Sequence, residues 1–258
     1  MKASYDLIGN IAIMKFPEGT QKTEKIIEAK KLLDEKKHLK TILEKEGKVK
    51  GRLRTIKTSF LSGEKSLVAD YVENGCRFKF NVETCYFSPR LSNERKEVSM
   101  QVKKGEKVLV LFAGVAPFPI VISKNSKADK IYSVELGKEC SKFAEENVKL
   151  NKINNIEVLQ GDVKKVIPKL FKQKIKFDRV VMPRPQLKES FLKEAFSIIK
   201  KKGIINYYGF SKDKNEIIDI INKEAIKSKK KIKILNIKIA GEIAPYKYRW
   251  RVDFIVNN

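Results

Sequence analysis

The sequence predicts a doubly wound α/β domain preceded by a small α+β module. Residues 108–111 form a short, continuous apolar run, which is typical of a strand buried on both faces of a parallel sheet. Similar runs recur at intervals of about 20–30 residues, with helical stretches between them, and this alternation favours the α/β class. The 258 residues are enough for one large domain or two modest ones.

The N-terminal module is expected to cover residues 1–82. Residues 5–15 contain two apolar runs separated by a glycine, which predicts a pair of strands. A helical pattern follows from about Thr23 to Glu46. Further short strands are expected at residues 52–60, 66–71 and 76–82, the last of which alternates apolar and polar residues.

The second domain is expected to cover residues 83–258, with residues 83–100 as the junction between the two modules. Its parallel strands are predicted at residues 108–111, 131–134, 156–159, 179–182 and 204–208. The helices between them are predicted near residues 137–150, 163–171, 187–200 and 213–227. Residues 231–240 and 248–256 predict two more strands, which we expect to form an antiparallel edge.

Charge and hydropathy limit the classes of partner. The chain has 56 basic and 31 acidic residues, a formal net charge of +25, which favours a polyanionic partner such as nucleic acid. Genome-wide base bias or heat adaptation would produce the same lysine-rich composition without any ligand. Because no apolar stretch reaches the roughly 18 residues of a membrane helix and no apolar signal core opens the chain, we expect a cytoplasmic protein with no membrane partner.

Cysteine and histidine usage argues against metal chemistry. Cys76, Cys85 and Cys140 are widely spaced and odd in number, so neither a disulfide framework nor a zinc site is predicted. The single histidine, His38, lies in a lysine-rich segment, which argues against histidine-ligated zinc and against a Ser-His-Asp triad. We therefore expect no metal, and acid–base chemistry by carboxylates, tyrosine or lysine.

The loop after the first strand of the α/β domain is the first candidate for a ligand contact. It comprises Phe112, Ala113, Gly114, Val115, Ala116, Pro117 and Phe118. Gly114 allows the backbone to approach a ligand, and Pro117 is suited to the start of the next helix. Because positions 116 and 117 are Ala and Pro, the loop does not match G-x-G-x-x-G, and a nucleoside without phosphates is favoured over a dinucleotide.

The ends of the next strands carry further candidates. Glu135 follows Gly114 by 21 residues, where an acidic side chain accepts hydrogen bonds from ribose hydroxyls. Gly161 and Asp162 end the third strand, where they would meet an adenine edge. Each feature alone is also compatible with an ordinary turn, but their order and spacing point to S-adenosylmethionine. The expected cofactor-binding set is completed by Tyr86, Arg95, Leu136 and Met182.

The junction carries the most informative segment, Tyr-Phe-Ser-Pro-Arg-Leu-Ser-Asn-Glu-Arg at residues 86–95. A purely structural interpretation exists, in which Ser92 or Asn93 caps a helix and Glu94 favours its positively charged first turn.

Together these segments resemble the tRNA (guanine37-N1)-methyltransferases of archaea and eukaryotes over nearly the whole chain. The landmarks are residues 5–12, residues 73–78, the junction motif and the Phe-Ala-Gly-Val-x-Pro-Phe loop. The resemblance implies a Rossmann-like class I methyltransferase domain with S-adenosylmethionine as cofactor. It also implies a tRNA anticodon stem-loop as partner, contacted by the N-terminal module, and we expect the enzyme to be a monomer.

The resemblance also implies catalytic roles. Guanine N1 is protonated at neutral pH, and the family assigns its deprotonation to the motif glutamate, which is Glu94 here. An arginine would stabilise the charge that develops towards O6, and Arg54 is the best match, with Arg90 second. The target base must leave its stack first.

Two departures from the family pattern affect these expectations. The chain begins directly at the second module, so weaker recognition of the whole tRNA shape is expected. Where the family usually has Asn-Leu-Pro, this chain has Pro183, Arg184 and Pro185, which we expect to border the substrate base. The changed loop suggests additional methylation of C7 in the wyosine precursor, 4-demethylwyosine. The alternatives are an aminocarboxypropyl transferase of wyosine biosynthesis and a catalytically weak tRNA-binding protein.

Three further residues are given structural roles. Asn147 and Asn151 match a family pattern on the helix after the second strand, and we expect them to act in packing or capping. Trp250 is expected to pack in the core rather than to stack on RNA bases.

Overall fold

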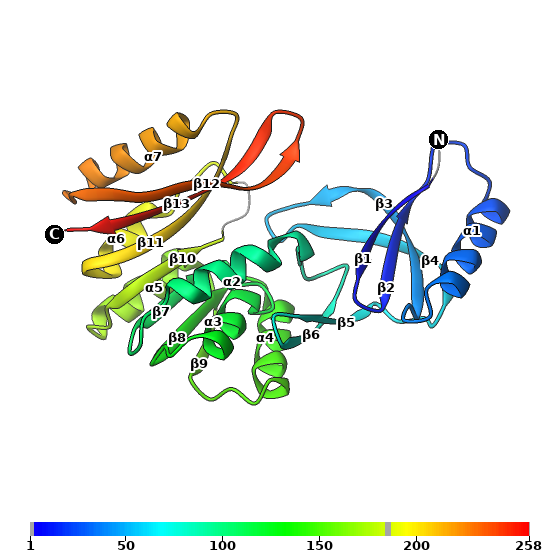
Figure 1. Ribbon diagram of the computed structural model, residues 1–258, viewed down its shortest axis with the longest axis horizontal. Helices are drawn as coiled ribbons and strands as arrows, with labels where there is room; N and C mark the ends of the chain where they lie inside the picture. Colours follow the sequence, from blue (N-terminus) through cyan, green and yellow to red (C-terminus); the bar gives the residue numbers. More distant parts are fainter. Residues whose placement is uncertain (1–2, 184–186, 258) are drawn as a thin grey trace. The chain divides into compact units, whose positions relative to one another are not determined.

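The computed structural model describes residues 3–183 and 187–257. The chain divides into two compact units, Met1–Pro89 and Arg90–Asn258 (Figure 1). The expected functional boundary after residue 82, between a module that contacts tRNA and a methyltransferase domain, stays a prediction, because structural compactness does not test function.

The first unit is an α+β module, as predicted. Its four-stranded sheet has the order β1-β2-β3-β4, and β5 pairs with β6 separately. The helix α1 connects the parallel strands β2 and β3 and packs its buried Ala29 and Leu32 on the sheet. The elements are β1 (Ser4–Ile8), β2 (Ile11–Lys15), α1 (Lys22–Glu35), β3 (Thr41–Lys50), β4 (Thr55–Gly63), β5 (Val68–Glu73) and β6 (Cys76–Asn81).

The predicted helix from Thr23 to Glu46 is wrong in its second half. The helix α1 ends at Glu35, and the strand β3 begins at Thr41. Residues 41–44 pair with β2, and Ile42 is completely buried in the core of this unit. The lysine- and glutamate-rich composition suits a helix, but pairing with strands distant in sequence overrides such local preferences.

The turn between β1 and β2 shows why a glycine stands at position 9. Gly9 has a φ of +58°, and a Cβ atom there would lie 1.9 Å from the carbonyl oxygen of Asp70. The next residue, Asn10, accepts a hydrogen bond from the backbone N–H of Asp70 at 2.7 Å. The turn therefore packs directly on β5. A larger residue at position 9 would push the turn away from β5.

The second unit is a doubly wound α/β domain, which confirms the predicted fold class. Its sheet has the order β12-β13-β11-β10-β7-β8-β9, in which β7 to β11 are parallel and β13 is antiparallel to both of its neighbours. The predicted antiparallel edge is thus confirmed. The elements are a short 3₁₀ turn η1 (Pro89–Leu91), α2 (Ser92–Gln101), β7 (Lys107–Leu111), α3 (Pro117–Asn125), β8 (Lys130–Glu135), α4 (Lys138–Leu150), β9 (Ile156–Gln160), α5 (Val163–Lys172), β10 (Phe177–Met182), α6 (Leu192–Ile198), β11 (Ile199–Ser211), α7 (Lys214–Lys227), β12 (Ile232–Ala244) and β13 (Lys247–Val256).

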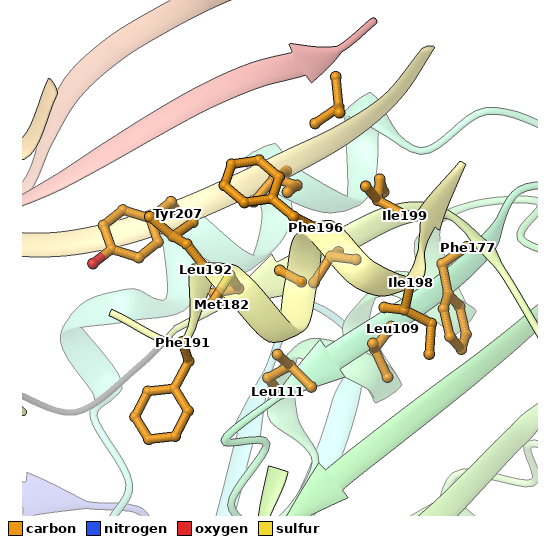
Figure 2. Packing of buried hydrophobic residues seen from close by; sticks show 14 of the residues in the cluster. Leu109, Leu111, Phe177, Met182, Phe191, Leu192, Phe196, Ile198, Ile199 and Tyr207 are labelled. Carbon is orange, nitrogen blue, oxygen red and sulfur yellow. The ribbon is translucent and has the colours of Figure 1, made fainter. Parts of the chain in front are cut away.

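A hydrophobic core lies on each face of this sheet. On one face, Val98 of α2 and Phe118 of α3 pack against Val108 and Val181. On the other, α5, α6 and α7 cover a larger cluster, in which Leu111, Met182 and Phe196 are buried (Figure 2). Trp250 is partly buried against this second cluster, in agreement with the expected core role. The continuous apolar runs of the central strands follow from burial on both faces.

Candidate cofactor and catalytic site

The loops that follow four parallel strands gather at one edge of the second sheet. In register, Leu111 of β7 pairs with Val134 of β8, and Glu135 pairs with Gln160 of β9. The order of the strands reverses between β7 and β10, because the chain first proceeds outward to β8 and β9 and then returns to β10 and β11. A ligand crevice in this kind of sheet lies at such a reversal, beyond the carboxyl ends of the strands.

The loop after β7 has an unusual backbone. Phe112, Gly114 and Ala116 all have positive φ angles, of 58°, 58° and 65°. For Phe and Ala this left-handed conformation costs about 1–2 kcal/mol per residue, and such strain tends to cluster at functional sites. The loop is held from two sides: Ala113 N–H donates to the carbonyl of Val134 at 2.9 Å, and Asn147 Nδ2 donates to the carbonyl of Val115 at 3.2 Å.

Pro117 and Phe118 then open the helix α3, as the sequence predicted for Pro117. Asn151 Nδ2 donates to the carbonyl of Asn147 at 2.8 Å, so both asparagines have the structural roles expected for them. The helix α4 thereby supports the loop after β7.

Glu135 joins two of the loops. Its Oε2 accepts a hydrogen bond from Gly114 N–H at 2.8 Å, and its Oε1 accepts one from Gly137 N–H at 2.7 Å. Burial raises the pKa of Glu135, although the backbone N–H groups of Gly137, Gly114 and Leu136 oppose the rise. A buried carboxylate at the end of the second strand is the usual acceptor for ribose hydroxyls in this architecture.

Four further residues of the predicted cofactor set, Leu136, Gly161, Asp162 and Met182, lie at or next to the ends of the strands β8, β9 and β10. Gly161 N–H donates to the carbonyl of Glu135, and Leu136 accepts at its carbonyl from Gln160 Nε2. Asp162 caps α5 by accepting from Lys164 N–H at 2.9 Å. The Met182 side chain is completely buried in the core, so its backbone is the part left for a ligand.

The substrate-loop predictions are only partly covered by the structure. Pro183 directly follows β10 and is partly buried. Arg184 and Pro185 lie outside the described residues.

The junction motif forms η1 and the first turn of α2. The residue before α2 is Leu91, and it makes no side-chain capping hydrogen bond, so the capping interpretation of Ser92 or Asn93 is wrong. Arg95 is almost completely buried, and its guanidinium carbon lies 5.9 Å from the centre of the Phe118 ring. Arg95 therefore lies against the start of α3, next to the loop after β7.

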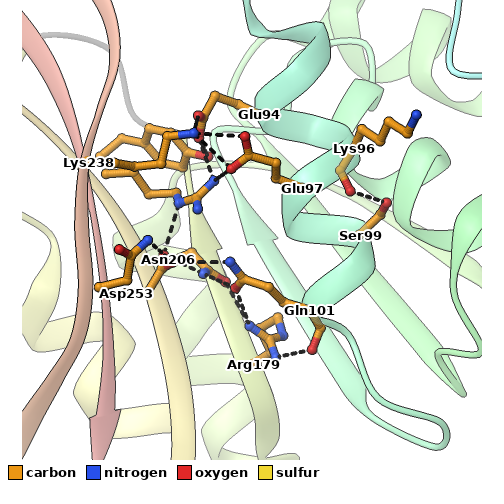
Figure 3. Close-up of polar contacts among 12 residues, drawn as sticks. Glu94, Lys96, Glu97, Ser99, Gln101, Arg179, Asn206, Lys238 and Asp253 are labelled. Atoms are coloured by element: carbon orange, nitrogen blue, oxygen red, sulfur yellow. Dashed lines mark hydrogen bonds and ion pairs between the residues drawn. The ribbon is translucent and has the colours of Figure 1, made fainter.

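Glu94 is buried in the same turn and is surrounded by cations and a hydroxyl. Its Oε2 accepts from Tyr208 Oη at 3.0 Å and from an Nη of Arg251 at 2.7 Å. Its Oε1 lies 3.1 Å from Lys238 Nζ (Figure 3). Tyr208 directly follows the β11 residue that pairs with Met182, so Glu94 lies near the carboxyl end of β10.

The charge states of Tyr208 and Arg251, two partners of Glu94, follow from the directions of their pKa shifts. Burial raises the pKa of Tyr208 well above its usual value, and the charge of Glu94 adds to the rise. Burial alone would lower the pKa of Arg251, but the surrounding groups, above all Asp253, raise it overall. Tyr208 is therefore a neutral donor and Arg251 a permanent cation at the carboxylate of Glu94.

Sequence reasoning missed Tyr208, Lys238 and Arg251. A signal exists for the last of these, because Arg251 and Asp253 alternate with the apolar residues 252, 254 and 256, in a strand that is buried at residues 251–254. Two charged side chains on the inner face of a central strand require partners, and the first turn of α2 supplies one of them.

Arg54 and Tyr86 belong to the first unit, and the structure brings them together. The guanidinium carbon of Arg54 lies 4.4 Å from the centre of the Tyr86 ring. Arg54 Nε is buried and has no hydrogen-bond partner among the residues that the structure describes. Arg90, the second choice for the catalytic arginine, is exposed in η1.

Neither a membrane-spanning helix nor a cluster of metal-ligating side chains occurs in the described ranges. No helix in residues 3–183 and 187–257 is long and apolar enough to span a bilayer. Within the same ranges, no three side chains of His, Cys, Asp or Glu are grouped as metal ligands would be.

Comparisons with known proteins agree over the whole chain. Residues 69–235 match the family described as the TRM5/TYW2 methyltransferase domain, and residues 1–66 match the TYW2 N-terminal domain. The tRNA (guanine(37)-N(1))-methyltransferase Trm5b of Pyrococcus abyssi is 34% identical, across 100% of this chain and 76% of that protein. The tRNA (guanine(37)-N(1))/4-demethylwyosine(37)-methyltransferase Taw22 of Nanoarchaeum equitans is 36% identical, across 97% of this chain and 98% of that protein.

Solved structures give the same result. A complex of aTrm5 with tRNALeu superposes with a TM-score of 0.86 at 29% identity, covering 98% of this chain and 72% of that one. Methanocaldococcus jannaschii Trm5 in complex with adenosine superposes with a TM-score of 0.83 at 28% identity, covering 99% of this chain and 74% of that one.

Proposed function

The chain belongs to the TRM5/TYW2 methyltransferase family, and on that premise we propose that it transfers the methyl group of S-adenosylmethionine to N1 of guanosine 37 in tRNA. One observation carries the proposal: a buried carboxylate, Glu94, lies in the same compact unit as the loops that suit a nucleoside cofactor, near the end of β10. The relatives that act on guanine 37 support the choice of base, and the complex of aTrm5 with tRNALeu supports tRNA as partner.

The cofactor assignment rests on the fit of the residues at the sheet edge. Glu135 offers a carboxylate to the ribose hydroxyls, and the loop at residues 112–116 lacks the glycine-rich cradle that a pyrophosphate requires. The adenosine complex of a relative supports a nucleoside here. The proposed contacts are Tyr86, Arg95, Phe112, Ala113, Gly114, Val115, Pro117, Phe118, Glu135, Leu136, Gly161, Asp162 and Met182.

When bound, S-adenosylmethionine supplies a methyl group activated by its positively charged sulfur. Glu94 would accept the proton of guanine N1 as the bond between N1 and the methyl carbon forms. The bond between that carbon and the sulfur would break at the same time, with the sulfur leaving as a neutral thioether. The charge that develops towards O6 requires a cation, for which Arg54 and Arg90 remain the candidates. The unpartnered Nε of Arg54 among the described residues supports the first of these. Pro183, with Arg184 and Pro185, is proposed to border the base.

We propose that the protein acts as a monomer on the anticodon stem-loop. A second activity is favoured by one observation. Taw22 is similar along almost the full length of both chains, and its name includes 4-demethylwyosine as a substrate. We therefore include methylation of C7 of this tricyclic base in the proposal. Proline at position 183, in place of the family's asparagine, is consistent with a pocket that accepts a larger base.

The test is transfer of labelled methyl groups to tRNA transcripts that carry G or A at position 37, with the product nucleoside identified by mass spectrometry. We expect the wild type to form 1-methylguanosine on the G37 transcript, and Glu94→Gln to lose about 10²–10⁴-fold in rate while it still binds the cofactor. The matched control is Glu145→Gln, at an exposed position of α4, which should keep the wild-type rate.

Other outcomes would contradict the proposal. Transfer of an aminocarboxypropyl group to precursor-bearing tRNA, without methylation, would favour the transferase alternative. Cofactor and tRNA binding without any transfer would favour a binding protein. Failure to methylate precursor-bearing tRNA, with normal activity on G37, would refute the second activity alone.

A further inference from the structure

The side chain proposed as the base, Glu94, is almost completely shielded from water. Only 4% of the residue is exposed. Burial disfavours the charged form of a carboxyl group, and a protonated glutamic acid is unable to accept a proton from guanine. A buried glutamate can therefore act as a base at neutral pH only where neighbouring groups stabilise its charge.

The neighbours of Glu94 come from three strands of the antiparallel edge. Tyr208 lies on β11, Lys238 on β12 and Arg251 on β13. Arg251 is 2% exposed at its side chain, whereas Lys238 is 33% exposed and also binds Glu97 at 2.8 Å and 2.9 Å (Figure 3). Arg251 also donates to Glu97 Oε2, at 3.1 Å, so the two cations differ in exposure rather than in partners. Arg251 is the buried cation, and Lys238 is a second cation that is partly open to water.

The contacts are divided unequally between the two carboxylate oxygens. A carboxylate has about four acceptor positions, two on each oxygen. Tyr208 and Arg251 both donate to Oε2, while Lys238 contacts Oε1. Counting the contacts made by the residues that the structure describes, Oε2 is filled and Oε1 keeps one position for a further donor. The N–H group of guanine N1 is a donor of this kind.

Arg251 is itself held in place. Its Nε lies 3.2 Å from Asp253 Oδ1, an ion-pair contact without hydrogen-bond geometry. Asp253 in turn accepts from Asn206 Nδ2 at 2.6 Å and from Gln101 Nε2 at 3.1 Å. Because Gln101 ends the helix that begins with the junction motif, the same network connects α2 to β11 and β13 (Figure 3).

From this geometry we propose that Arg251 and Tyr208 are positioning residues for the base. They hold Oε2 of Glu94, place a positive charge and a hydroxyl donor against the buried carboxylate, and leave Oε1 to accept the proton of guanine N1. The inference rests on the proposed function, since it assumes that Glu94 is the base. It assigns a catalytic purpose to the buried polar cluster between α2 and the C-terminal strands.

The test is the pH dependence of single-turnover methyl transfer to a G37 transcript, from about pH 5.5 to pH 9. Removing the cation in Arg251→Gln favours the protonated carboxyl, so activity should be lost at a higher pH. We expect the midpoint of the acidic limb to rise by about 1–3 units, with a lower plateau rate. Tyr208→Phe should shift the midpoint less and in the same direction, and Arg251→Lys should return it towards the wild-type value.

Arg179→Gln is the matched control. Arg179 is also fully buried in an ion pair, with Glu106 at 2.8 Å, and it belongs to the same network through Asn206 at 3.1 Å. The contacts found for it among the described residues do not include Glu94. We expect this variant to lower the melting temperature as Arg251→Gln does, but to leave the midpoint of the acidic limb unchanged. Cofactor titration shows that each variant is folded.

Two outcomes would overturn the inference. One is an unchanged midpoint in folded, active Arg251→Gln or, if that variant does not fold, in Tyr208→Phe. The other is an equal shift in Arg179→Gln, which would reveal a general effect of destabilisation. An inactive wild type, or a fully active Glu94→Gln, would instead refute the proposed function, and either is seen without any change at position 251.

Discussion

Two buried carboxylates in the second unit differ in their surroundings. Glu94 is paired with the cations of Arg251 and Lys238, whereas Glu135 accepts hydrogen bonds from the backbone N–H groups of Gly114 and Gly137. Burial raises the pKa of Glu135, although the backbone N–H groups of Gly137 and Gly114 oppose the rise. Two carboxyl groups in such different surroundings suit different tasks, one in binding a ligand and the other in exchanging a proton.

At this residue scale we predict a pH-dependent affinity for S-adenosylmethionine. Because the pKa of Glu135 is raised, the carboxylate that accepts the ribose hydroxyls becomes protonated at a pH above the usual range of glutamate. The affinity for S-adenosylmethionine should therefore fall as the pH is lowered from about 7 towards about 5. Calorimetric titration of the cofactor across this range measures the effect.

The comparison variant is Glu135→Gln. It should bind the cofactor about 10–100-fold more weakly at pH 7, since a charge-assisted hydrogen bond contributes about 1.5–3 kcal/mol. It should also lose most of the pH dependence. If the variant and the wild type weaken in parallel on acidification, another group is responsible.

At the scale of elements, the helix α4 acts as a support for the loop after β7. Asn147 is completely buried, and it donates from this helix to the carbonyl of Val115. Asn147→Leu would leave that carbonyl without its partner, at a cost of about 1–3 kcal/mol of unfolding free energy. Because the carbonyl belongs to the strained loop, we also expect cofactor affinity to fall, which fluorescence titration would measure.

Asn155→Leu is the control for this prediction. Asn155 donates to the carbonyl of Ala128 and accepts from Ser123 Oγ, in the segment that leads into β9 rather than after its carboxyl end. It should lower stability in urea unfolding without a loss of cofactor affinity. Equal losses of affinity in both variants would mean that the helix supports the loop only through global stability.

At the scale of the whole molecule, the net charge of +25 is expected to dominate binding of tRNA. Each phosphate contact releases counterions, so the logarithm of the association constant should fall linearly with the logarithm of the salt concentration. We expect a loss of at least about tenfold between roughly 50 and 200 mM salt for tRNA. Binding of S-adenosylmethionine, measured in parallel, should change little. A flat salt dependence for tRNA would mean that the lysine-rich composition does not serve RNA binding.

Elements with a local signal in the sequence were predicted correctly, whereas elements that depend on pairing with distant segments were predicted less well. The five parallel strands and the helices between them were predicted because a strand buried on both faces needs a continuous apolar run, a purely local signal. The segment at residues 41–46 was assigned to a helix because its partners, β2 and β4, lie outside any local window. Turn and strand boundaries moved by a few residues for the same reason.

The candidate site divides in the same way. The sequence by itself determined the fold class, the order of the loops after β7, β8, β9 and β10, and the candidacy of Glu135, because strand succession and spacing are properties of the chain alone. Glu94 became a candidate through the resemblance of residues 86–95 to the methyltransferase family. Only the tertiary structure decided what surrounds Glu94. Its partners Tyr208 and Arg251 are 114 and 157 residues away along the chain, and a pairing at that separation is created only when the antiparallel β13 inserts into the sheet beside β11.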